Sequence, residues 1–223
     1  MMRLMAFLSA VVICVLPAQG SASIVTSHIT GDADMLAQIH DLSFVCEGRI
    51  GDRGGAATYE QDINTGQVQA QYNWPNSTPV DFSIAYDSLT NLLQFTVGGQ
   101  TLNYYPTDPF SEIYIRTRAV DAGTSILLDN LILDGVSLGD TSYASASSAG
   151  LDILWVRGFA DPATSGFTLT GQSTMYWSGS APTQSRLAYQ VKFDNAPSVA
   201  EPASVILALA GIACAAGAKR RPA

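Results

Sequence analysis

The fold class follows from the stretch Gln67-Val68-Gln69-Ala70-Gln71-Tyr72, in which polar and apolar side chains alternate. A period of two places the apolar side chains on one face of a β-strand and the glutamines on the other. Residues 58–63 precede this stretch and are joined to it by Asn64-Thr65-Gly66. Asn and Gly readily adopt the positive φ that a tight hairpin requires. The two segments therefore predict an antiparallel hairpin with one solvated face.

The middle of the chain continues this β pattern. A second hairpin is predicted from residues 92–97 and 101–105, which flank Gly98-Gly99. Further strands are expected at residues 42–50, 80–86, 112–118, 125–133, 151–157, 167–177 and 186–193. Only residues 34–40 favour a helix, and residues 140–150, rich in Ser and Ala, favour a flexible loop. About ten strands without alternating helices predict one all-β domain over residues 23–194, a jelly-roll-like β-sandwich, with a closed barrel as the alternative.

The N-terminus has the three parts of a secretory signal peptide. Arg3 precedes an apolar segment, residues 4–16, and the small residues Ala18, Gly20 and Ala22 follow. This pattern is typical of an export signal that is removed by cleavage. Residues 1–22 are therefore predicted to be a signal peptide, and the domain after them is expected to be exported.

The C-terminus has the pattern of a membrane anchor. The linker and sorting motif, residues 195–202, end with Ala200, Glu201 and Pro202, and an uncharged, mostly apolar run follows over residues 203–218. As a helix, this run covers only about two thirds of a ~30 Å hydrocarbon layer. A basic tail, residues 219–223, begins immediately after it. Its cations must reach the cytoplasmic headgroups, so Lys219, Arg220 and Arg221 predict a stop-transfer signal after one short transmembrane helix.

The net charge of the predicted domain narrows the classes of partner that it could bind. Between Ser23 and Ser198 the chain has 18 acidic and 7 basic residues, so nucleic acid and anionic membranes are poor partners. The acidity would also suit loose binding of divalent cations, but the region that contains Asp129, Asn130 and Asp134 lacks the regular oxygen spacing of a calcium loop.

Cys46 is the only cysteine of the exported domain. No disulfide is expected within that domain, and the apolar neighbours of Cys46 favour a buried thiol.

The common motifs of catalysis and cofactor binding are missing from the sequence, and no cofactor or metal is predicted. The separation of His28 and His40 fits neither a helix face nor a strand pair, which favours a solvated N-terminal segment over metal binding. Glu60 and Asp62 share one face of a predicted strand, as in the Glu-x-Asp-x-x-Glu strand of laminarinase-type jelly-roll glycosidases. Thr65 occupies the position of the general acid there, so a retaining mechanism is incomplete. We therefore expect a solvated strand face and no enzyme activity, with a glycoside hydrolase as the second alternative.

Aromatic side chains suggest carbohydrate binding as the first alternative. Trp74 precedes Pro75, and Trp177 precedes Ser178-Gly179, so both tryptophans lie near predicted strand ends, where a ligand face can form. If they are exposed, Trp74 and Trp177 are the candidate sugar-stacking residues, and Tyr104, Tyr105 and Tyr176 could join them. Trp155 lies within an apolar strand and is expected to be buried.

The tail as a whole resembles the PEP-CTERM sorting signal of Gram-negative bacteria. The resemblance rests on Val199-Ala200-Glu201-Pro202-Ala203-Ser204, the apolar helix after it and the cluster Lys219-Arg220-Arg221. It implies recognition by an exosortase, a membrane protease-transpeptidase, and an association with exopolysaccharide and biofilm or floc formation. Ala200 replaces the first proline of the Pro-Glu-Pro motif, whereas Glu201 and Pro202 are retained.

The predicted domain is similar to the β domains that recur before such tails, including those described only as choice-of-anchor domains. The similar segments are residues 115–118, 128–135, 166–171 and 185–188. This similarity implies a surface protein without known catalysis. The sequence therefore predicts a structural or adhesive protein that is held transiently in the inner membrane. It is then displayed on the cell envelope surface or in the extracellular matrix, with exosortase and exopolysaccharide as expected partners.

Overall fold

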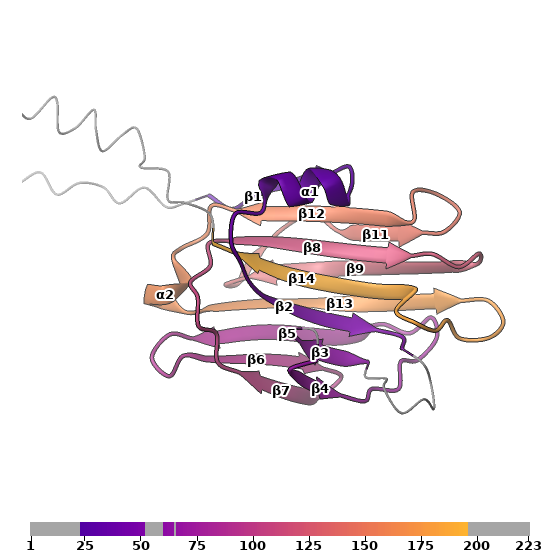
Figure 1. Cartoon of the computed structure of the whole chain (residues 1–223), viewed down its shortest axis with the longest axis horizontal. Helices are drawn as coiled ribbons and strands as arrows, with labels where there is room; N and C mark the ends of the chain where they lie inside the picture. The colour runs from indigo at the N-terminus through magenta and orange to yellow at the C-terminus, as the bar shows by residue number, and fades with distance from the viewer. Residues whose placement is uncertain (1–22, 52–59, 65, 196–223) are drawn as a thin grey trace, which may run out of the picture.

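The described part of the chain folds into two antiparallel β-sheets that face each other (Figure 1). The structure is a computed structural model that describes residues 23–51, 60–64 and 66–195. The predicted signal peptide, sorting motif, transmembrane helix and basic tail lie outside these residues. The predicted all-β sandwich is confirmed, with two sheets in place of the alternative closed barrel.

The first sheet has seven strands. Their spatial order is β1 (Val25–Ile29), β12 (Leu151–Arg157), β8 (Glu112–Ala119), β14 (Leu187–Asp194), β2 (Leu42–Arg49), β3 (Gln61–Ile63) and β4 (Val68–Ala70). The hairpin of β3 and β4 is the one predicted from the glutamine-rich stretch. Asn64 and Gly66 in its turn have φ values of 53° and 84°. These are the positive φ values that a tight hairpin turn requires.

The second sheet also has seven strands. Its continuous order is β10 (Val136–Ser137), β9 (Thr124–Leu133), β13 (Phe167–Trp177), β5 (Val80–Asp87), β6 (Leu92–Val97) and β7 (Gln100–Tyr104), while β11 (Ser142–Ser145) pairs with the opposite end of β9. Gly98 and Gly99 join β6 to β7, which confirms the second predicted hairpin.

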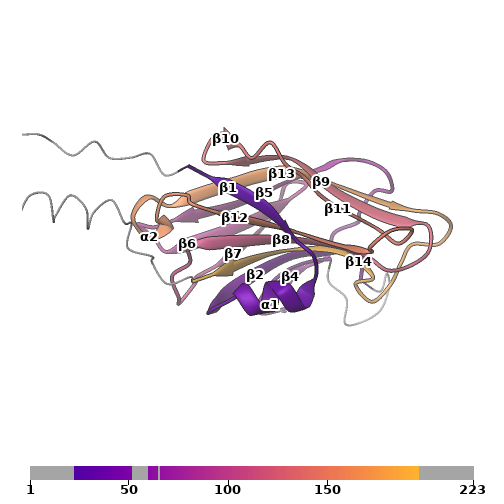
Figure 2. The ribbon, with the colours of Figure 1, turned by 90° about the horizontal axis from the view of Figure 1, so that it is seen from above.

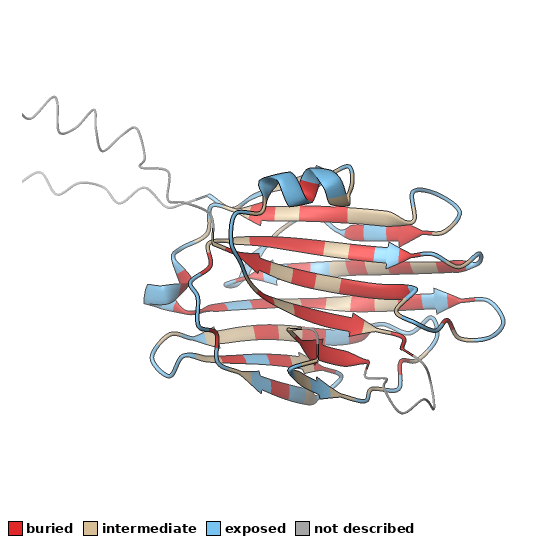
Figure 3. Cartoon of the chain, viewed as in Figure 1, coloured by how far each residue is buried: buried red, intermediate tan, exposed pale blue. Residues whose placement is uncertain are grey.

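The hydrophobic core lies between the sheets and is built from the inward side of each alternating strand (Figure 3). One part of it is aromatic. Phe44 stacks on Phe193 with ring centroids 4.3 Å apart, and Phe110 packs edge-on against both rings. Cys46 is fully buried beside them on β2, as predicted. Burial of these side chains is the main source of stability in a domain that has no disulfide among its described residues.

Two short helices accompany the sheets. Helix α1 (Asp32–Gln38) covers the outer side of the first sheet, and Figure 2 shows it on the side away from the second sheet. Met35 anchors it by packing against Tyr114 and Ile153. The helix predicted at residues 34–40 is confirmed, but the observed helix begins and ends two residues earlier than predicted. Helix α2 (Pro162–Ser165) was not predicted. No helix of the described ranges is long and apolar enough to cross a membrane.

Every strand predicted from the sequence overlaps an observed strand. Strands β1, β10 and β11 were not predicted. The flexible loop predicted for residues 140–150 is wrong, because β11 lies within it. Ser142 in β11 is buried and its hydroxyl lies 3.0 Å from that of Thr117 across the sandwich. The burial predicted for Trp155 is wrong as well. Its side chain is only half-buried, because it faces outward from β12, where it stacks on Tyr114.

Candidate functional site

The outward side of the second sheet is rich in uncharged polar side chains. We call it the polar face, and it consists of the outward-pointing residues of β9, β13, β5, β6 and β7. Four hydroxyl residues form a row across it, because Thr170 lies opposite Ser83, Ser83 opposite Thr96, and Thr96 opposite Thr101. Neighbouring strands are about 4.8 Å apart, so the row extends for about 14 Å across the sheet.

A β-bulge brings an amide onto the polar face next to this row. In β9 the buried positions are Ile126 and Leu128 before the bulge and Leu131 and Leu133 after it, so the alternation shifts by one residue. Asn130 is the extra residue, and its φ of 51° is the left-handed conformation that Asn tolerates. A bulge of this kind re-aims a side chain without ending the strand. The Asn130 amide therefore points outward.

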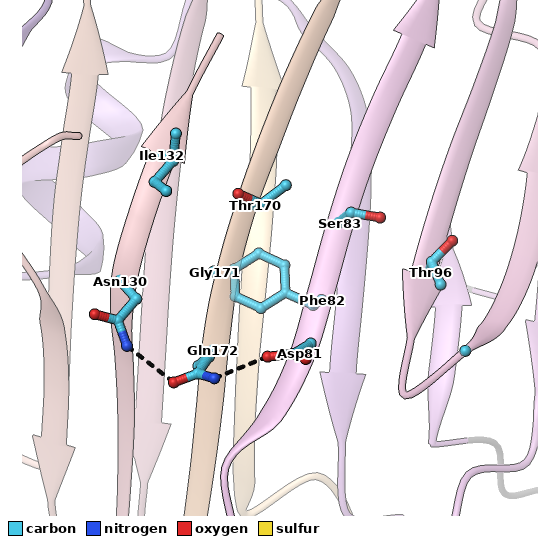
Figure 4. Close-up of a pocket in the computed structure, with 10 residues that line it drawn as sticks. Asp81, Phe82, Ser83, Thr96, Asn130, Ile132, Thr170, Gly171 and Gln172 are labelled. Carbon is cyan, nitrogen blue, oxygen red and sulfur yellow. Dashed lines mark hydrogen bonds between the residues drawn. The ribbon is translucent and has the colours of Figure 1, made fainter. Parts of the chain in front are cut away.

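Asn130 is the first member of a hydrogen-bonded chain across three strands (Figure 4). Its Nδ2 donates to Oε1 of Gln172 over 2.9 Å, and Nε2 of Gln172 donates to Oδ1 of Asp81 over 2.8 Å. These bonds fix both amide orientations. The side chains therefore present defined donors and acceptors to a ligand, with little conformational entropy left to lose on binding.

A hollow of about 590 Å³ lies over this part of the polar face. It is lined by Asp81, Phe82, Ser83, Thr96, Gly99, Asn130, Ile132, Thr170, Gly171 and Gln172. Gly171 forms part of its floor. A Cβ there would come within 2.9 Å of the Phe82 ring and 2.8 Å of the Leu131 side chain, so these core side chains would have to shift. The hollow joins the hydroxyl row to the amide chain, and it is the candidate site for a neutral polar ligand.

Polar pairs extend the face beyond the hollow. Oγ1 of Thr96 lies 2.8 Å from that of Thr101, and Nε2 of Gln94 donates to Oδ1 of Asn103 over 3.1 Å. The strands of this sheet contain no lysine or arginine. The arrangement suits a ligand with many hydroxyl groups, because amides and hydroxyls both donate to and accept from such a ligand.

Two exposed tyrosines lie on the same outward side. Tyr176 of β13 is 44% exposed, and Tyr143 of β11 is 52% exposed and lies opposite Leu127 of β9. Tyrosine rings offer an apolar surface and a polar tip to a sugar. The sequence predicted a role for Tyr176 if it were exposed, but not for Tyr143, which lies in the segment that was expected to be a loop.

The two tryptophans predicted to bind carbohydrate are buried instead. Trp74 is 2% exposed and packs edge-on against Tyr72, with ring centroids 4.8 Å apart. Trp177 is 7% exposed and belongs to the core between the sheets. Neither indole presents a face to solvent. The stacking hypothesis is therefore wrong for these two residues, because both indoles pack into the hydrophobic core.

Glu60 and Asp62 do not form the solvated face that was predicted for them. They are only 3% and 1% exposed. Asp62 lies directly opposite Glu47 of β2, and Nη2 of Arg49 is 3.2 Å from its Oδ2. Burial raises the pKa of Asp62 to about 7, and the charge of Glu47 acts in the same direction. The cluster is an internal ion-pair network rather than an open acid–base pair.

The two histidines have different carboxylate partners. Nδ1 of His28 lies 2.8 Å from Oδ1 of Asp152, and its Nε2 lies 3.2 Å from Oδ1 of Asp140. His40 follows α1, and its ring lies 3.7 Å from Asp194. The described residues include no group of three or more His, Cys, Asp or Glu arranged to hold a metal ion. His28 belongs to strand β1, so the solvated segment expected there is wrong in part.

The residues of the predicted sorting signal, Ala200, Glu201 and Pro202, and the stop-transfer residues Lys219, Arg220 and Arg221 lie outside the described residues. A scan against models of protein families finds no match to this chain, and a search of curated proteins finds no significant match. The sequence contains little sign of the bulge. Asp129-Asn130 interrupts an apolar strand, but Leu127 and Ile132 are apolar as well, so the shift in alternation is visible only in the burial of the side chains.

Proposed function

We propose that this chain is an exported surface protein whose jelly-roll-like domain holds a neutral glycan on the polar face. The observation that carries the proposal is the hydroxyl row beside the chain from Asn130 through Gln172 to Asp81. Sugar hydroxyls bind best to preordered amides and hydroxyls. The absence of cations from these strands favours an uncharged chain over an acidic one.

The remaining parts of the proposal concern export and attachment. Residues 1–22 direct the domain across the inner membrane, and the tail with Glu201 and Pro202 is recognised by an exosortase. The protein is then displayed on the cell envelope or in the exopolysaccharide, where binding to glycan makes it structural or adhesive. The resemblance of the tail to sorting signals of exopolysaccharide-associated proteins supports this part.

Binding of neutral polysaccharides to the purified chain tests the glycan proposal. Affinity electrophoresis in gels containing neutral exopolysaccharide or dextran measures retardation directly. We expect Gln172→Ala to weaken binding by about tenfold, because it removes one member of the chain and leaves Asn130 and Asp81 unpaired. Asn130→Gly should also weaken binding while keeping the left-handed backbone of the bulge.

Gln69→Ala is the matched control, since Gln69 is an exposed glutamine on β4 of the other sheet. It should bind as the wild type does. Equal retardation of Gln172→Ala, Asn130→Gly and wild type would refute the polar face as the binding site. A wild-type chain that none of the neutral glycans retards would refute neutral glycan binding itself.

A further inference from the structure

The basic residues of the described chain are concentrated on one of the two sheets. The strands of the first sheet carry Arg49, Arg116, Arg118, Arg157 and Lys192, whereas those of the second sheet carry no cation. In a chain of net charge −8, this division is a strong local asymmetry. It makes the outward side of the first sheet the place where an anionic ligand would meet the least repulsion.

Three of these cations form what we call the basic patch: Arg116, Arg118 and Lys192. On β8, Arg116 and Arg118 are separated by one residue, so both point outward, away from the core. On β14, Lys192 lies opposite Tyr114 and is therefore a diagonal neighbour of Arg116. The geometry of paired strands places successive members of the patch about 7 Å apart. The cations therefore follow a line and do not converge on one point.

Two adjacent hollows flank the basic patch, and both are lined by Asp32, Arg116 and Arg118. One has a volume of about 320 Å³ and also includes Gln190 and Lys192. The other has a volume of about 500 Å³ and continues along residues 146 and 148–151. Together they form a surface that is longer than a small ion needs.

Two of the three cations make no close ion pair within the described ranges, although the charge of Asp32 acts on both of them and that of Glu47 acts on Lys192. The guanidinium of Arg116 is held by Asp32, with its Nε 2.6 Å from Oδ1 and its Nη2 2.7 Å from Oδ2. Arg118 is exposed and Lys192 is half-buried, and neither makes an ion pair with a described residue. Burial lowers the pKa of Lys192, and the like charge of Arg116 acts in the same direction. An anion beside Lys192 would offset both unfavourable effects.

We infer that the basic patch binds an acidic polysaccharide, a glycan chain with carboxylates at regular intervals. Cations in a line match repeated carboxylates better than they match one small anion. Gln190 lies opposite Arg116 and two residues from Lys192 on β14. Its Nε2 donates to Oε2 of Glu47 over 3.2 Å, and its amide oxygen can accept from a sugar hydroxyl. At physiological ionic strength the screening length is about 8 Å, so the patch acts locally despite the acidity of the whole domain.

This inference goes beyond the proposed function and does not depend on it. The basic patch and the polar face lie on the outward sides of different sheets, with the core between them (Figure 2). One domain could therefore hold a neutral and an acidic chain at the same time. Such a domain would cross-link a mixed polysaccharide matrix without a second copy.

Titration of the full purified chain with polygalacturonate tests the inference, by calorimetry in the presence of a chelator, which excludes bridging by divalent cations. We expect Arg118→Gln and Lys192→Met each to weaken binding by about tenfold, as loss of a charge-assisted hydrogen bond predicts. Asp32→Asn should have the opposite effect and strengthen binding, because it releases Arg116. Binding should also weaken steeply as sodium chloride is added.

Two controls test whether binding requires the basic patch and a sugar backbone. Gln172→Ala, on the polar face, should bind polygalacturonate as the wild type does, whatever its affinity for neutral glycans. Polyglutamate carries the same charge on a peptide and should bind more weakly. Unchanged affinity in both Arg118→Gln and Lys192→Met would overturn the inference, as would no binding by the wild type or equal binding of polyglutamate.

Discussion

Asp62 shows how a single residue of this fold responds to pH. Its carboxyl group is buried opposite Glu47 and beside Arg49, and burial raises its pKa from 3.8 to about 7. Between about pH 4 and pH 7, the folded state retains a proton that the unfolded state has released. The contribution of Asp62 to stability therefore decreases as the pH rises through this window.

Replacing Asp62 by Asn removes this contribution. In urea titrations at intervals between pH 4 and pH 8, the stability of Asp62→Asn relative to wild type should increase as the pH rises. Asp108→Asn is the control, because it makes the same chemical replacement at an exposed aspartate. Parallel stability profiles for wild type and Asp62→Asn would contradict the prediction.

Trp74 and Trp177 make a different prediction at the residue scale. Because both indoles are core groups, Trp74→Ala and Trp177→Ala should each destabilise the fold by about 3–5 kcal/mol. The measurement is the midpoint of urea unfolding followed by circular dichroism. Tyr176→Ala removes an exposed ring and should leave that midpoint nearly unchanged. Equal midpoints for all three variants would show that the indoles are not packed in the core.

The attachment of strand β1 involves a titrating group. Among the described strands it pairs only with β12, at the edge of the first sheet, and His28 links it to Asp152 of β12 and to Asp140. Partial burial lowers the pKa of His28, but the hydrogen bonds to Asp152 and Asp140 outweigh this effect and raise it above 6.5. The protonated ring therefore holds β1 more firmly than the neutral ring does.

We expect amide protons of β1 to become less protected as the pH rises past the pKa of His28, because the stabilisation is complete below pH 6.5 and is lost above the folded pKa. Hydrogen exchange at pH 5.5 and pH 8, corrected for intrinsic rates, measures this change. In His28→Gln the protection of β1 should be low at both values. His40→Gln, which alters the other histidine, should behave as the wild type does, and a loss of pH dependence in that variant would argue against His28 as the cause.

At the scale of the whole molecule, the proposed sorting signal determines where the two faces act. Replacing Glu201 and Pro202 by Ala should leave the protein in the inner membrane with its tail intact, because the residues that an exosortase would recognise are lost. Mass spectrometry of the C-terminus, with and without a functional exosortase, measures processing. A chain that still ends at Ala223 in both strains, or normal release of the double variant, would refute exosortase sorting.

The sequence by itself determined the elements that depend on neighbouring residues. Alternation over 67–72 and turn chemistry at Asn64 and Gly66 are local properties, so the hairpins and nearly all strands were predictable. Strand β11 was not, because Ser142-Tyr143-Ala144-Ser145 has little intrinsic strand character and is held by β9 and by Thr117 of the opposite sheet. Pairing of this kind depends on residues distant in the sequence.

Only the tertiary structure decided which side of each strand meets water and which residues meet across strands. Alternation gives two faces to a strand but does not say what covers them. Asp62 was therefore predicted on a solvated face although it is buried, and the sequence did not decide the exposure of Trp74, which is buried too. The polar face and the basic patch arise for the same reason. Each is assembled from strands far apart in the chain, and the register of their hydrogen bonds, which no single segment encodes, brings their side chains into line.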